Sequence, residues 1–150
     1  MNFTFWAPLA GALALLFAFY LAMRINKVSP GNDTMKDIAK AIHEGAMAFL
    51  FREYRTLGIF VVAVAVIIFI TGKVTPGAES LQPQTAIAFI IGAICSVTAG
   101  YIGMQVATKA NVRTANAAQE SANKALGVAF SGGAVMGMSV VGLGLIGLGI

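Results

Sequence analysis

The sequence predicts an all-α membrane protein whose four transmembrane helices pack within a polytopic bundle. Of its 150 residues, 58% are hydrophobic and 11% are charged, whereas a soluble domain carries about 25% charged residues. The mean hydropathy of +0.83 arises from long uncharged runs of the length that crosses a bilayer. In the third run, small residues recur at every fourth position along two helix faces, which favours close packing on both sides. The two lines are Ala88, Gly92, Ser96 and Gly100, and Ala99, Gly103 and Ala107.

The first predicted span covers residues 3–23. It is uncharged and is followed by Arg24 and Lys27, while Trp6 and Tyr20 suit the two membrane interfaces. A cleaved signal peptide is the alternative, but such a peptide has its positive charge before the apolar run and a small-residue cleavage site after it. Because the charge here follows the run and no such site is present, we expect an uncleaved helix with its N-terminus outside.

A turn is predicted between the first and second helices. Pro30 and Gly31 together break the first helix. Thr34, followed three residues later by Asp37, resembles a capping box. The second helix is therefore expected to begin near Thr34.

The second helix is predicted to be longer than a membrane span. Helical spacing of apolar residues runs unbroken from Met35 to Thr71, a range that corresponds to roughly 55 Å at 1.5 Å per residue. The hydrocarbon core is only ~30 Å thick. We therefore place residues 24–47 on the cytoplasmic side and residues 48–71 in the membrane.

The rest of the chain is predicted to form an outside connection, two spans and a cytoplasmic segment. Residues 72–84 form the connection and residues 85–107 the third span. Residues 108–126 are rich in alanine and lack Gly and Pro, so they are expected to be helical and cytoplasmic, with a turn near Asn111. Residues 127–150 form the fourth span.

The fourth span carries a stripe of small residues. Gly133 and Gly137 form a GxxxG pair, a pattern typical of helix contacts in membranes. The stripe consists of Ala117, Ser121, Ala125, Ala129, Gly133 and Gly137. The sequence reaches Ile150 within an apolar run, without a polar flank, and we expect it to be a truncated chain.

The positions of the basic residues predict the topology. With the N-terminus outside, nine of the ten Lys and Arg residues fall on the inner side and only Lys73 falls outside, as the positive-inside rule requires. The nine are Arg24, Lys27, Lys36, Lys40, Arg52, Arg55, Lys109, Arg113 and Lys124. This distribution explains the net charge of +4 without nucleic acid, and no aromatic residues interleave with the basic ones to form a stacking platform.

Candidate catalytic, cofactor-binding and metal-binding residues are not found. A site for Mg²⁺ and phosphate needs several carboxylates or a glycine-rich loop followed by Lys and Ser or Thr, and neither pattern is present. His43 and Glu44 are adjacent, so on a helix they point in different directions. A metal site there is a weak alternative to a solvated or interhelical contact.

The other chemically interesting residues are predicted to serve packing or anchoring. Cys95 lies alone in an apolar helix and is expected to be a small buried residue. Arg52, Glu53, Tyr54 and Arg55 stand where the second helix enters the apolar zone, which favours interfacial anchoring with Arg–Glu pairing over a gating role. Three methionines are expected to pack between helices: Met104, Met136 and Met138.

The apolar cores of the spans contain no ionisable residue. Intramembrane charges mark ion pathways, so these four helices are not expected to form one themselves. They are predicted to act as a scaffold.

Three blocks of the sequence resemble the membrane-bound, ion-translocating pyrophosphatases, in the N-terminal region of that family. The blocks are TMKDIAKAIHEGAMAFLFREY, GAICSVTAGYIGMQVATKANVRTA and ALGVAFSGGAVMGMSVVGLGLIGL. The most specific part runs from Gly100 through Gly103 and Met104 to the Ala110–Arg113 block. The Lys109–Arg113 end is interpreted as an inner-side anchor and turn into the fourth helix.

The resemblance implies more than the residues alone do. Family members are homodimers with roughly sixteen helices per subunit, arranged as an inner ring with the active site and ion gate and an outer ring. They hydrolyse pyrophosphate with Mg²⁺, some with K⁺ or Na⁺ as activator, and pump H⁺ or Na⁺ out of the cytoplasm. The family's aspartate-rich motifs are absent from residues 1–150. The resemblance therefore implies outer-ring helices without catalytic, cofactor-binding or metal residues, inactive alone and embedded in the plasma membrane.

The alternative is a non-enzymatic four-helix membrane protein, such as a small transporter or an assembly subunit. A small transporter needs a functional charge inside the bilayer, and these spans have none. The pumped ion and any K⁺ requirement stay open at this stage.

Overall fold

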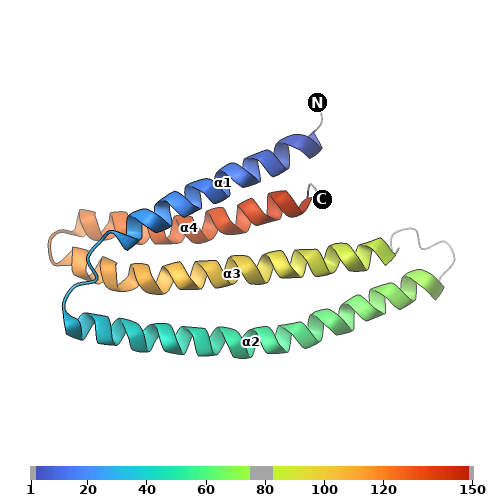
Figure 1. Ribbon diagram of the computed structural model, residues 1–150, viewed down its shortest axis with the longest axis horizontal. Coiled ribbons are helices and arrows are strands. Elements are labelled where there is room, and N and C mark those ends of the chain that lie inside the picture. The colour runs from blue at the N-terminus through green and yellow to red at the C-terminus, as the bar shows by residue number, and fades with distance from the viewer. Residues whose placement is uncertain (1–2, 75–82, 149–150) are drawn as a thin grey trace.

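The computed structural model describes residues 3–74 and 83–148, which form four helices (Figure 1). The helices are α1 (Phe3–Asn26), α2 (Asp33–Val74), α3 (Pro83–Ala118) and α4 (Ala122–Leu148). Each is long and apolar enough to cross a membrane, and the described residues contain no strand. The predicted all-α class with four membrane spans is confirmed. Most of the predicted outside connection, residues 75–82, lies outside the described residues, as do residues 149–150.

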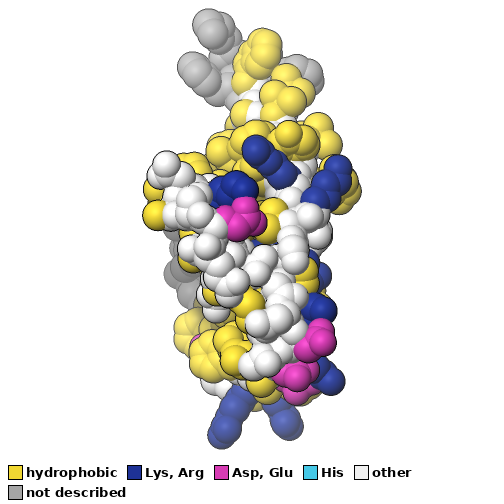
Figure 2. Space-filling view, turned by 90° about the vertical axis from the view of Figure 1, so that its left-hand side faces the viewer, with side chains coloured by type: hydrophobic (Ala, Val, Ile, Leu, Met, Phe, Trp, Pro, Cys, Tyr) yellow, Lys and Arg dark blue, Asp and Glu magenta, His cyan; other side chains and the backbone are white. Residues whose placement is uncertain are grey.

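The helices do not pack in chain order. α1 packs on α4, α4 on α3, and α3 on α2, and α1 also touches α3 (Figure 1). The α1–α2 link and the α3–α4 turn lie together at one end of the molecule, which we call the linker end (residues 27–32 and 119–121). Basic side chains gather at this end (Figure 2). This grouping agrees with the predicted charge distribution, while the side of the membrane that the linker end faces stays a prediction.

The two-sided packing of α3 is confirmed by its contacts with α2 and α4. A Cβ atom added at Gly100 would lie 2.9 Å from the Tyr54 hydroxyl of α2. One added at Gly103 would lie 2.7 Å from Cγ of Met136 on α4. Atoms at these distances would overlap, so the small residues let both neighbours approach the α3 backbone closely.

The face of α4 that packs in the described chain is not the predicted GxxxG face. No atom lies within 4 Å of a Cβ added at Gly133 or Gly137. The buried positions of α4 are Gly132, Val135, Ser139 and Gly142. Their spacing of three, four and three residues follows one side of a helix, and this side includes Val135, which fills the space between α1 and α3 in the buried core.

The second helix begins at a different cap from the one predicted. The Met35 N–H donates to Oδ1 of Asn32 at 2.9 Å, and the Lys36 N–H donates to the Asn32 carbonyl at 3.1 Å. Asn32 is therefore the N-cap, and the predicted Thr34 capping box is wrong. Gly31 precedes it with a positive φ of 88°, a conformation that glycine adopts without strain. The predicted long helix is confirmed, at 42 residues.

The turn predicted near Asn111 is also wrong. α3 continues as a helix to Ala118, and the turn occupies residues 119–121. The alanine-rich segment contains no residue that would end a helix. The Lys124 N–H donates a hydrogen bond to Oγ of Ser121 at 3.3 Å, so Ser121 caps the N-terminus of α4. The Lys109–Arg113 stretch is therefore helical throughout.

The buried core is small and lies between α1, α3 and α4. Its buried residues are Ala18, Leu21, Ile25, Ala110 and Val135. Many large apolar side chains face outward instead, including Phe51 at 77% exposed and Phe130 at 76%. Apolar outer surfaces of this kind are expected to contact lipid or further protein, because either contact removes the apolar groups from water.

Candidate functional site

Polar side chains of α3 hold the link between α1 and α2. Arg113 donates from Nε to the Val28 carbonyl at 3.0 Å and from Nη1 to the Lys109 carbonyl at 2.9 Å. Asn116 donates from Nδ2 to the Ser29 carbonyl at 3.2 Å. Sequence analysis found Arg113 as an anchor but missed its partner, because 85 positions separate the two residues. The charged end of α3 thus fastens the linker end of the bundle.

His43 makes an interhelical contact, one of its two predicted roles. Its Nδ1 lies 2.9 Å from Oγ1 of Thr108, a buried residue of α3. The Thr108 hydroxyl donates to the Met104 carbonyl at 2.9 Å, so its oxygen accepts from Nδ1–H of His43. Glu44 instead faces Lys40, with Oε1 at 4.0 Å from Nζ. The arrangement ties α2 to α3 through hydrogen bonds.

The residues at the apolar entry of α2 behave differently from one another. Tyr54 donates its hydroxyl to the Val97 carbonyl of α3 at 3.0 Å, which fixes the second helix against Gly100. The predicted pairing of Arg52 or Arg55 with Glu53 is wrong for the described part of the chain, where the ion pairs involve none of the three. All three side chains are exposed, as befits the interface between membrane and water.

The carboxylates are dispersed. Asp33, Asp37, Glu44, Glu53 and Glu120 are all exposed. Three of the five form ion pairs with Lys36, Lys40 or Lys124. Within residues 3–74 and 83–148, no three His, Cys, Asp or Glu side chains gather as metal ligands. Since Mg²⁺ requires several oxygen ligands in near-octahedral geometry, the donor groups described here do not fit it.

The sulfur-containing residues of α3 and α4 differ in burial. Met136 packs against Gly103, as predicted. Met104 is half-buried and Met138 is exposed. Cys95 is a free, half-buried thiol rather than a fully buried residue, because it borders a groove between α3 and α4.

The fold and these contacts define a polytopic helical membrane protein in which several polar side chains join one helix to another or to the α1–α2 link. The family of inorganic H⁺ pyrophosphatases matches residues 12–150. The chain belongs to this family, which confirms the resemblance seen in its sequence.

Three relatives illustrate the match. The chain is 56% identical over 135 residues, or 90% of its length, to a putative K⁺-stimulated pyrophosphate-energized sodium pump of Clostridium tetani. It is 47% identical over 87% of its length to a K⁺-insensitive pyrophosphate-energized proton pump of Methanosarcina mazei. It is 39% identical over 91% of its length to a similarly named proton pump of Pyrobaculum aerophilum. The alignments cover 19%, 18% and 19% of these relatives, so the chain spans about a fifth of their length.

Proposed function

We propose that this chain is the N-terminal part of a membrane pump that couples pyrophosphate hydrolysis to the translocation of H⁺ or Na⁺. The match to the family over residues 12–150 carries the proposal. The relatives are named as pyrophosphate-energized pumps, one for sodium and one for protons, and these names indicate the energy source and the two candidate ions. In such a pump, water cleaves pyrophosphate into two phosphates, and the free energy released drives an ion across the membrane.

We assign a scaffolding role to the four helices, within a bundle of outer-ring type. This rests on two observations. The described polar contacts join α2 to α3, and α3 to the α1–α2 link. The segments Leu57–Gly72 and Thr85–Ala107 contain no Asp, Glu, Lys, Arg or His, the residue types that mark an ion pathway inside a membrane. The catalytic site with its Mg²⁺ then lies outside these 150 residues, which alone bind neither Mg²⁺ nor pyrophosphate appreciably.

Further parts of the proposal concern the assembly and its place in the cell. We expect a homodimer in the plasma membrane, as the family resemblance implies. We also expect the N-terminus outside and the linker end in the cytoplasm, because the basic residues gather at the linker end. The relatives include both K⁺-stimulated and K⁺-insensitive pumps, so activation by K⁺ is a property to measure. The alternative of a small non-enzymatic transporter receives no support from relatives named as pyrophosphate-energized pumps.

The proposal is tested with the full-length product of the gene that encodes this chain, reconstituted into sealed vesicles. Adding Mg²⁺ and pyrophosphate outside should release phosphate and simultaneously acidify the lumen or load it with Na⁺. A pH-sensitive dye, radioactive sodium and a phosphate assay measure the three quantities, each with and without K⁺. Vesicles that contain folded protein yet neither hydrolyse pyrophosphate nor move either ion would contradict the proposal.

A further inference from the structure

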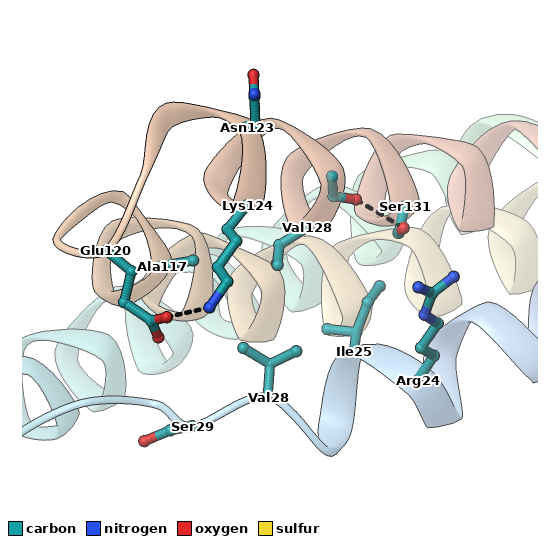
Figure 3. A pocket seen from close by; sticks show the side chains of 11 residues that line it. Arg24, Ile25, Val28, Ser29, Ala117, Glu120, Asn123, Lys124, Val128 and Ser131 are labelled. Atoms are coloured by element: carbon teal, nitrogen blue, oxygen red, sulfur yellow. Dashed lines mark hydrogen bonds and ion pairs between the residues drawn. The ribbon is translucent and has the colours of Figure 1, made fainter.

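We propose that the groove between the C-terminal end of α1 and the N-terminal end of α4 binds the headgroup of an anionic phospholipid. The groove has a volume of about 730 Å³ and lies at the linker end (Figure 3). Arg24 borders it from α1 and Lys124 from α4, while Asn123 points away from it. Ile25 and Val28 supply apolar surface between them. The groove therefore combines two cations with an apolar wall.

The charges of the groove leave one cation available. Lys124 forms an ion pair with Glu120, the carboxylate that also borders the groove. In the described ranges, no hydrogen bond or ion pair engages the Arg24 side chain. Two cations and one carboxylate leave a charge of +1, and the N-terminus of α4 adds partial positive charge. A phosphate diester carries the complementary charge, and a guanidinium binds phosphate oxygens in bidentate fashion.

The position of the groove selects a lipid over a free phosphate. Arg24 stands at the end of the apolar run of α1, and Lys124 at the start of that of α4. Basic side chains at this depth reach the headgroup layer while their stems lie on apolar surface. Gly127 and Val128 continue the groove along α4 into the apolar zone, where an acyl chain would lie. Free phosphate has no apolar part that could contact this apolar wall.

The proposal is independent of pyrophosphate hydrolysis and is tested by lipid binding. The full-length protein is purified in non-ionic detergent, and native mass spectrometry counts bound phosphatidylglycerol and phosphatidylcholine at equal concentrations. We expect a preference for phosphatidylglycerol. Arg24→Gln should reduce that preference about fivefold, the factor that corresponds to about 1 kcal/mol for a basic residue at an anionic surface. Adding Lys124→Gln should reduce the preference further, because the Glu120 carboxylate then borders the groove without its ion-pair partner.

Two further variants distinguish lipid binding in the groove from a general effect of surface charge. One removes a charge outside the groove, and the other fills the groove without changing any charge. Lys40→Gln removes an exposed cation that lies outside the groove and should leave the preference unchanged. Gly127→Leu fills the groove without altering charge, since no atom lies within 4 Å of a Cβ at this position, and should weaken phosphatidylglycerol binding. The proposal is overturned if the wild type shows no preference, if Lys40→Gln acts like Arg24→Gln, or if Gly127→Leu has no effect. Displacement of the lipid by millimolar inorganic phosphate would equally overturn it, because the headgroup alone would then suffice.

Discussion

Replacing Gly11 with alanine is expected to destabilise the protein by about 2 kcal/mol, although alanine is the better helix former. A Cβ atom at Gly11 would lie 2.6 Å from the Gly142 carbonyl oxygen and 2.9 Å from Cγ1 of Ile146. The nearest atom belongs to the backbone of α4, so no side-chain rotation relieves the overlap. α1 must move away from α4, and both helices then lose packing along their shared face.

The measurement is the unfolding of the full-length protein in detergent by heat or denaturant. Gly137→Ala is the matched control, because it makes the same chemical change on α4 at a position with no atom within 4 Å. This control should be as stable as the wild type or slightly more so. If Gly11→Ala proves as stable as Gly137→Ala, the close approach of α1 and α4 is not a feature of the folded protein.

Replacing Arg113 with glutamine is expected to cost about 2 kcal/mol, because hydrogen bonds from charged donors contribute more than neutral ones. The variant loses the bond from Nε to the Val28 carbonyl and leaves that carbonyl without its described side-chain donor. The effect should concentrate in the α1–α2 link. Hydrogen exchange at the hydrogen-bonded amides of Lys27, Val28 and Gly31 should accelerate about 30-fold, the factor that corresponds to this energy if the link opens locally.

Lys109→Gln provides the comparison for Arg113→Gln. Lys109 has the same charge and lies one turn earlier on α3, and its side chain is exposed. Its replacement should leave exchange at the amides of Lys27, Val28 and Gly31 unchanged. Equal protection of the link in both variants would show that Arg113 does not hold it.

The order and class of the helices could be predicted from the sequence because each depends on local features. Uncharged runs of membrane length and the Pro30-Gly31 break are visible without any partner. The two-sided packing of α3 was also predictable, because small residues at four-residue spacing on a membrane helix are typical of faces that other helices approach closely.

Features that depend on partners could not be predicted in the same way. Gly132 and Gly133 are adjacent in sequence, yet only Gly132 faces Ala110 across the helix contact. The register of a helix against its neighbour decides between them, and the GxxxG pattern carries no information about that register. Likewise, the Val28 carbonyl is a backbone group that any residue type would supply, so its bond to Arg113 left no trace in the sequence.

The exposed surface of α2 fits the scaffolding account. This helix packs on α3 and makes no comparable contact with α1 or α4. Its exposed surface includes Phe51, Ile59, Phe60 and Ile67, each more than half exposed. Apolar surface of this extent needs lipid or additional helices beside it, as expected for a chain that spans about a fifth of its relatives.

The central claim, that these helices support a pump without providing its chemistry, is tested most directly by pyrophosphate hydrolysis in carboxylate variants. Asp37→Asn, Glu44→Gln and Glu53→Gln are introduced singly into the full-length protein, and the rate of phosphate release is measured with saturating Mg²⁺. Because none of these exposed carboxylates belongs to a metal-binding group in the described chain, each variant should hydrolyse pyrophosphate within about twofold of the wild-type rate. A loss of about 100-fold or more, the size expected on removing a catalytic acid or base, in a variant with an unchanged melting temperature would contradict the claim.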